Sequence, residues 1–95
     1  MAAYVLGNVN IHDPEGYREY TSQVQATLDP FEGRFVVRAG AYEALEGEFT
    51  ADRLVLIEFP TVEHARGWYN SEAYQAILPI RHANSTARFI TLIEG

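Results

Sequence analysis

Arginine is the residue type best suited in this sequence to bind an anion. All seven basic residues are arginines, and a guanidinium offers a carboxylate two parallel hydrogen bonds. Arg38 lies two residues before Gly40, and a bend at that glycine would turn the Arg38 side chain into a pocket. We therefore predict that Arg38 binds ligand. The alternative is cross-strand ion pairing at a sheet edge. Arg34 and Arg38 would then share one side of their strand, and Arg53 would pair with Glu43 or Glu46.

A second group of candidates surrounds a predicted break between two helices at Asn70-Ser71. Arg81 shares a helical stripe with Tyr74 and two aliphatic residues if the helix continues through Pro79. A buried arginine is costly unless it is paired. Its partner is therefore either an acid such as Glu58 or the anion of a ligand.

Aromatic residues around this break, and two on the first helix, either line a pocket or fill the core. Their hydroxyl and indole groups need hydrogen-bond partners in both cases. The predicted ligand-binding set combines these aromatic residues with the arginines: Arg38, Trp68, Tyr69, Ser71, Tyr74, Arg81, Tyr17 and Tyr20.

The three histidines, His12, His64 and His82, match no metal-binding spacing, and the chain has no cysteine. No metal site is predicted. The sequence also lacks the glycine-rich loops of nucleotide sites, so no cofactor is predicted. His12, at the end of the first strand, is a candidate for acid–base work, with Tyr69 and Arg38 as further catalytic candidates.

The positions of these residues depend on the predicted helices and strands. Period-two patterns predict strands over residues 4–11, 34–46, 53–59 and 88–94, the second bent at Gly40. Asp13-Pro14 begins a helix that ends at Leu28. A second helix, capped by Thr61, breaks at Asn70-Ser71, restarts, and kinks or ends at Pro79.

The order β-α-β-β-α-β predicts a ferredoxin-like α+β fold, with one antiparallel four-stranded sheet and its helices on one face. The third strand is apolar on both sides, since Leu54 and Leu56 oppose Val55 and Ile57. The uncovered side needs a partner, because soluble monomers rarely expose large apolar patches. We therefore predict a homodimer, a dimeric α+β barrel in which two sheets enclose a shared core.

Composition limits the kinds of partner. The 95 residues fit a single domain over residues 1–95. Thirteen acidic and seven basic residues give a net charge of −6, which argues against nucleic acid and anionic membranes as partners. No apolar run approaches the length of a membrane span, and the first residues lack a basic signal-peptide region. A cytoplasmic location is expected.

Several spaced motifs together resemble a known family. The matching residues run along the whole chain: Asp13-Pro14, Tyr17, Tyr20, Gly33-Arg34-Phe35, Arg38, Gly40, Leu45-Glu46-Gly47, Arg53, Glu58-Phe59-Pro60, Ala65, Trp68-Tyr69, Ser71, Tyr74-Gln75, Arg81 and Glu94-Gly95. On these residues the sequence resembles the domain-of-unknown-function family 1330, within the dimeric α+β barrel superfamily. It departs at Glu32 and Ala39, where the family prefers glycine, and at Glu72-Ala73, where a proline is common.

The resemblance implies the same dimeric ferredoxin-like fold and no established activity. Relatives in the superfamily include cofactor-free oxygenases of aromatic compounds, small isomerases and decarboxylases, and ligand-sensing domains, and a fold does not select among them. The favoured hypothesis is a pocket between helices and sheet for a small, partly apolar anion such as an aromatic or keto acid. The alternatives are a cofactor-independent oxygenase or isomerase acting on such a molecule, and a noncatalytic structural or interaction module.

Overall fold

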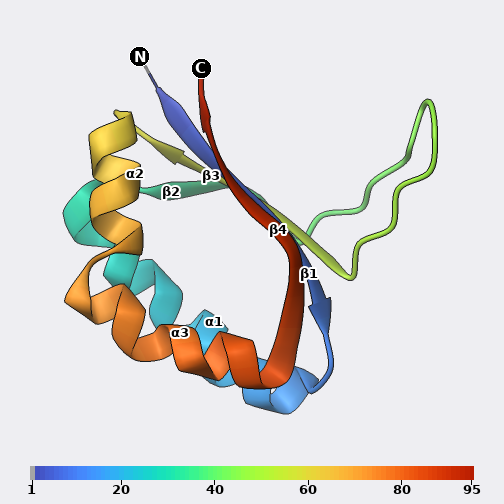
Figure 1. The fold of residues 1–95 in the computed structure, drawn as a ribbon, viewed down its shortest axis with the longest axis horizontal. Helices are drawn as coiled ribbons and strands as arrows, with labels where there is room; N and C mark the ends of the chain where they lie inside the picture. Colours follow the sequence, from blue (N-terminus) through green and yellow to red (C-terminus); the bar gives the residue numbers. More distant parts are fainter. Residues whose placement is uncertain (1) are drawn as a thin grey trace.

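The fold has the predicted element order, with the second helix divided in two. A computed structural model describes residues 2–95 (Figure 1). Its elements are β1 (Ala3–Ile11), α1 (Pro14–Leu28), the 3-10 turn η1 (Asp29–Phe31), β2 (Arg34–Arg38), β3 (Arg53–Phe59), α2 (Val62–Tyr69), α3 (Glu72–Asn84) and β4 (Ser85–Glu94). The ferredoxin-like α+β prediction is confirmed.

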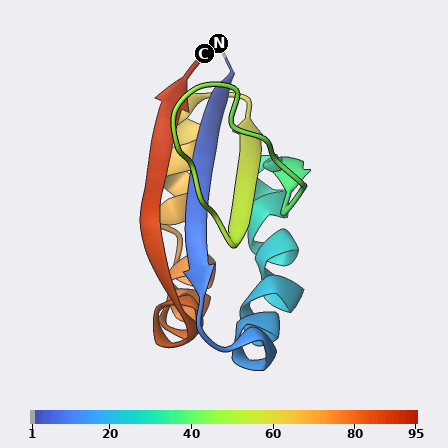
Figure 2. The same cartoon turned by 90° about the vertical axis from the view of Figure 1, so that its right-hand side faces the viewer.

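The four strands form one antiparallel sheet in the order β2-β3-β1-β4. All three helices cover the same face, so that the other, open face is turned toward the viewer in Figure 2. Alternate residues of β1 and β3 point into the core, among them Val5, Val9, Ile57 and Phe59. The core therefore lies between the sheet and a single layer of helices.

Side chains at the helix starts fix where each helix begins. Asp13 Oδ1 accepts hydrogen bonds from the amides of Glu15 and Gly16, and Thr61 and Ser71 cap α2 and α3 in the same way. Pro79 lies inside α3, and the helix continues through it to Asn84. Of the two outcomes left open at Pro79, the structure therefore has the longer helix, which extends the apolar stripe to Arg81.

The prediction of a long second strand bent at Gly40 is wrong. β2 ends at Arg38, because Ala39 has a left-handed backbone with φ of 57° that turns the chain out of the sheet. The bulge in the pairing of β2 with β3 lies earlier in the strand, between Phe35 and Val37. Phe35 pairs with Ile57, and Arg38 pairs with Val55 on the same face.

This bulge also separates two arginines that were predicted to share one side of the strand. Arg34 pairs with Glu58 on the open face, whereas Arg38 lies with Phe35 on the helix-covered face. The Arg38 guanidinium carbon lies 4.6 Å from the centre of the Phe35 ring. One extra residue in a strand is enough to exchange the faces of all residues that follow it.

Residues 39–52 form a loop that projects from the open face, drawn in green in Figures 1 and 2. Residues 39–50 are all exposed, and the side chain of Leu45 is 87% exposed. The loop holds its own shape by packing Tyr42 edge-on against Phe49, with ring centres 5.1 Å apart. It returns to the sheet where the Asn8 amide donates to the carbonyl of Thr50, at 3.2 Å.

No residue separates α3 from β4. Asn84 is the last helical residue and Ser85 the first of the strand, which begins three residues before the predicted start. The Asn84 carbonyl accepts hydrogen bonds from the amides of His12 (2.8 Å) and Asp13 (3.2 Å), where β1 passes into α1. The end of α3 is therefore fixed to the sheet.

Candidate functional site

A small cavity lies under α1, between the sheet and the end of α3. Its volume is about 30 Å³. Two arginines and two tyrosines supply most of its polar groups, and the remaining lining is almost entirely apolar. We call it the arginine–tyrosine cavity, and its lining residues are Val9, Tyr17, Tyr20, Thr21, Val24, Phe35, Arg53, Val55, Ile57, Arg81 and Ile90.

Arg81 reaches this cavity from α3 and is 3% exposed. Its Nε has no hydrogen-bond partner in residues 2–95, and neither ion pair in that part of the chain includes it. The predicted partner Glu58 lies on the opposite face of the sheet, where it accepts from Arg34 Nε (2.7 Å) and from the Tyr4 hydroxyl (3.2 Å). The Glu58 pairing is therefore wrong, and Arg81 is a buried cation without a carboxylate partner.

Arg53 is the second cation of the cavity. It is the first residue of β3 and pairs with Val9, so it lies on the helix-covered face. Its guanidinium carbon is 5.7 Å from the centre of the Tyr17 ring, within range of a cation–π contact. The alternative that paired Arg53 with Glu43 or Glu46 is wrong, since both ion pairs within residues 2–95 involve other residues.

Sequence reasoning missed Arg53 as a site residue, although the signal was present. Arg53 has the same parity along β3 as Val55, Ile57 and Phe59. Two of these three, Ile57 and Phe59, are core residues. An arginine in phase with an apolar strand face is directed toward the interior, and the sequence pattern alone could have placed it there.

The two tyrosines supply neutral phenol groups. Burial raises the pKa of Tyr17, with the positive charges of Arg53 and Arg81 acting in the opposite direction. Burial also raises the pKa of Tyr20 far above its ordinary value, and the neighbouring Tyr74 adds to that effect. Both phenols therefore keep their protons at neutral pH. The Tyr17 hydroxyl can donate to a ligand, whereas the Tyr20 hydroxyl is bonded to that of Tyr74.

The electrostatics of the cavity favour an anion. Arg53 and Arg81 both line it, and its lining contains no aspartate or glutamate. A buried positive charge without a counterion costs free energy that a bound anion would offset. The arrangement can bind one carboxylate or enolate oxygen group between two guanidinium groups, with a phenol beside it.

Three other predicted site residues have structural partners. Trp68, 2% exposed, donates from Nε1 to Thr27 Oγ1 at 3.0 Å and packs against Tyr74 with ring centres 4.1 Å apart. Tyr74 bonds to Tyr20 through their hydroxyls at 2.8 Å. Ser71 caps α3 by accepting from the amide of Tyr74. These residues do not line the arginine–tyrosine cavity; they pack and hydrogen-bond next to the residues that do.

Two further candidates lie apart from this cavity. His12 is exposed at the end of β1, where its Nε2 is 3.1 Å from Thr86 Oγ1. Arg38 is exposed and contacts the site only through Phe35, which lines the cavity. The structure therefore brings Tyr17, Tyr20 and Arg81 together, adds Arg53, and leaves His12 and Arg38 outside.

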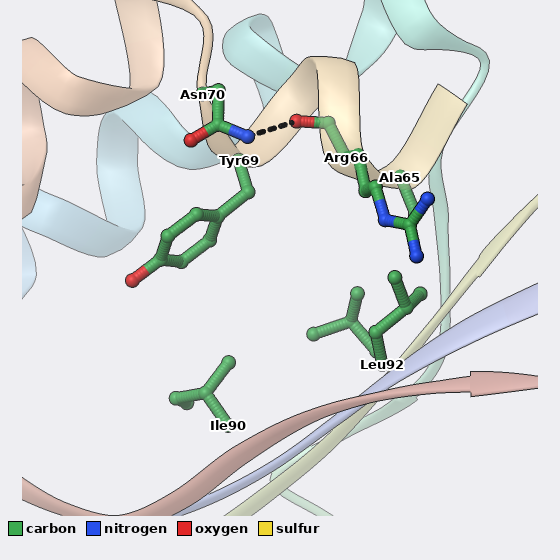
Figure 3. Close-up of a pocket in the computed structure, with 7 residues that line it drawn as sticks. Ala65, Arg66, Tyr69, Asn70, Ile90 and Leu92 are labelled. Carbon is green, nitrogen blue, oxygen red and sulfur yellow. Dashed lines mark hydrogen bonds between the residues drawn. The ribbon is translucent and has the colours of Figure 1, made fainter. Parts of the chain in front are cut away.

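Tyr69 lines a different cavity, between α2 and the sheet (Figure 3). This α2 cavity has a volume of about 190 Å³ and a largely apolar lining. Tyr69 and Arg66 extend from α2 toward the strand that carries Ile90 and Leu92. The complete lining is Val5, Ala65, Arg66, Tyr69, Asn70, Ile90 and Leu92.

Residues 2–95 carry neither a metal-binding cluster nor a membrane-spanning helix. No group of three or more histidine, aspartate or glutamate side chains there is placed to hold a metal ion. None of the helices in the described chain is both long and apolar enough to cross a membrane.

Comparison with known proteins identifies the family and the fold. The family model described as "Domain of unknown function (DUF1330)" matches residues 2–95. No curated protein matches the sequence.

Solved structures give the same fold. A protein of unknown function from Rhodopseudomonas palustris is 17% identical, with a TM-score of 0.76 over 99% of this chain and 82% of that one. SnoaB, a cofactor-independent oxygenase from Streptomyces nogalater, is 14% identical, with a TM-score of 0.68 over 99% of this chain and 92% of its own. At these identities the likeness shows the fold alone.

Proposed function

The chain belongs to the DUF1330 family of domains of unknown function, and on that premise we propose that it binds a small, partly apolar organic anion between its helices and its sheet. One observation supports this above the others. Arg81 is 3% exposed, lines a cavity together with Arg53, and has no carboxylate partner within residues 2–95. An unpaired buried guanidinium lowers stability, and ligand binding is a reason to keep one.

The structural alternative explains this arginine less well. A noncatalytic module would pair Arg81 with an acid such as Glu58, but Glu58 accepts its hydrogen bonds from Arg34 and Tyr4 on the other face. The alternative does explain Trp68 and Tyr74, which pack and hydrogen-bond within the core. The proposed site is therefore narrower than the predicted residue set and centres on Tyr17, Tyr20, Arg53 and Arg81.

The test is binding of benzoate and phenylpyruvate, measured by thermal shift and titration calorimetry. We expect both acids to stabilise the protein, and Arg81→Met to abolish the effect. Arg18→Met is the matched control, because Arg18 is exposed on α1 and outside every cavity described above. The proposal fails if neither acid stabilises the protein, or if Arg81→Met and Arg18→Met bind equally well.

A cofactor-independent oxygenase is the second candidate, favoured by the likeness to SnoaB, which carries that description. In such a reaction Arg53 and Arg81 would stabilise an enolate-like oxygen in a site from which water is excluded. Tyr17 is then a better candidate than His12 or Tyr69 for proton transfer, since it lines the arginine–tyrosine cavity. Oxygen consumption with aromatic keto acids, lost in Tyr17→Phe and retained in His12→Gln, would support this candidate.

We also propose that the protein is a homodimer joined through the open face of the sheet. That face carries Leu6 and Leu56, paired across β1 and β3, and Phe89 on β4, all half-buried in the single chain. Ile93 on the same face is 41% exposed. A second copy would cover this apolar surface. Sedimentation should give twice the 10.7 kDa of one chain, and a stable monomer at micromolar concentration would contradict the proposal.

A further inference from the structure

The arginine–tyrosine cavity and the α2 cavity share one lining residue, Ile90. The first, at about 30 Å³, has room for only about two water molecules. The second, at about 190 Å³, is larger than the cavity of about 150 Å³ that holds benzene in another protein. The charged cavity therefore has room for a carboxylate group but not for the ring of an aromatic acid, and the apolar cavity has room for one substituted ring.

We infer that the ligand spans both cavities: an aryl-alkyl carboxylate, with its carboxylate between Arg53 and Arg81, its alkyl chain passing Ile90, and its ring in the α2 cavity. This inference deepens the proposed function and rests on it. Such a molecule has a charged end and an apolar end, and the two cavities differ in the same way. Arg53 and Arg81 lie at one end, and aliphatic side chains with the Tyr69 ring lie at the other.

Ile90, which the alkyl chain would pass, packs onto a glycine of the neighbouring strand. Ile90 pairs across the sheet with Gly7, which also pairs with Val55. A Cβ atom at Gly7 would lie 3.0 Å from Val55 Cγ2 and 3.1 Å from Ile90 Cδ1. The missing side chain of Gly7 therefore lets Ile90 and Val55 pack close to the sheet backbone, and a larger residue there would push Ile90 toward the boundary between the two cavities.

The inference is tested with phenyl-substituted acids of increasing chain length: benzoate, phenylacetate, 3-phenylpropanoate and 5-phenylpentanoate. Titration calorimetry should show affinity rising by about tenfold or more from benzoate to the best longer acid, because only a longer chain lets the ring enter the α2 cavity. Equal affinity across the series, or a steady fall with length, would overturn the inference.

A cavity-filling variant locates the ring. Ala65 lines the α2 cavity and is 1% exposed, so Ala65→Leu should weaken binding of the longer acids by about tenfold and leave benzoate unchanged. Ala76→Leu, at an exposed position of α3, is the matched control. If Ala65→Leu does not fold, Leu92→Phe fills the same cavity from β4.

The two proposals fail in different ways. If every acid binds, Arg81→Met abolishes binding, and neither Ala65→Leu nor Leu92→Phe changes the affinity series, the spanning ligand is wrong and the anion site stands. If no acid in the series binds, the proposed function fails, and the spanning ligand fails with it.

Discussion

The hydroxyl groups of Tyr20 and Tyr74 lie 2.8 Å apart, and their hydrogen bond joins α1 to α3 inside the helix layer. Both side chains are buried. Tyr17 lies one turn before Tyr20 on α1, and Arg81 follows Tyr74 on the buried stripe of α3. The hydrogen bond therefore holds the two helical walls of the arginine–tyrosine cavity in register.

Removing that hydrogen bond should destabilise the fold. Tyr20→Phe leaves the Tyr74 hydroxyl buried without its partner, which costs about 1–3 kcal/mol of unfolding free energy. Urea denaturation followed by the fluorescence of Trp68, the single tryptophan, measures the change. Tyr69→Phe is the control, since Tyr69 is less buried and should lose under about 0.5 kcal/mol. Equal losses in the two variants would contradict the role of the Tyr20–Tyr74 bond.

Arg81→Met should raise stability while it removes anion binding. The variant replaces a buried, unpaired cation by an apolar side chain of similar length, which is expected to add about 1–3 kcal/mol to the unfolding free energy. Urea denaturation without added ligand measures it, with Arg18→Met as the near-neutral surface control. A loss of stability in Arg81→Met would show that Arg81 has a structural partner.

Stability should fall in alkaline solution because of Tyr17 and Tyr20. Burial raises the pKa of both above the ordinary value of 10.0, so the folded state keeps these protons when unfolded tyrosines begin to ionise. Their contribution is complete below about pH 10 and is lost as the pH rises further. The urea midpoint should stay level from about pH 7 to 9 and then drop. The double variant Tyr17→Phe, Tyr20→Phe should show a smaller drop, and an equal drop would assign the effect to other groups.

Ala39→Gly should stabilise the protein. Ala39 and Glu32 are the two non-glycine residues with positive φ among residues 2–95, each at 57°. Glycine has no steric penalty there, and the net gain after its greater entropy loss is about 0.5–1 kcal/mol. Ala76→Gly, the same change inside α3, should instead cost about 1 kcal/mol. Thermal melting of both variants checks the opposite signs.

Leu56→Arg should convert the proposed dimer to a monomer. Leu56 pairs with Leu6 and Val37 at the centre of the open face, so a dimer through that face would bury two facing arginine charges. Sedimentation should fall to the mass of one chain. Gln25→Arg, exposed on the helix side, should leave the mass unchanged. An unchanged mass in Leu56→Arg would place any dimer interface elsewhere.

Local patterns were sufficient to predict most of the fold. Asp13-Pro14, Thr61 and Ser71 mark the helix starts by chemistry that acts within three residues, and the structure has caps at all three. The second strand was misjudged because its end depends on a backbone angle. Nothing in the residue type of Ala39 indicates a positive φ, and the continuing apolar residues after it resemble a strand.

The site was predicted only in part, because its members come from three separate elements. Tyr17, Tyr20 and Arg81 followed from helical spacing. Arg53 could have been predicted only by extending the apolar alternation of β3 to a charged residue. Arg34 and Arg38 lie on opposite faces because of the bulge at Val36, which no local motif marks. The pairing of Glu58 was misassigned because the face of a strand residue was inferred from its neighbours' hydrophobicity.

The direct passage from Asn84 to Ser85 restricts how this chain can change in length. One residue inserted there would rotate the preceding helix by about 100° relative to the strand and exchange the two sides of β4. Arg81 would then leave its cavity, and Ile90 would leave the boundary between the two. Insertions and deletions should therefore be tolerated in the exposed loop between residues 39 and 52. At the junction of Asn84 and Ser85 they should destroy the site.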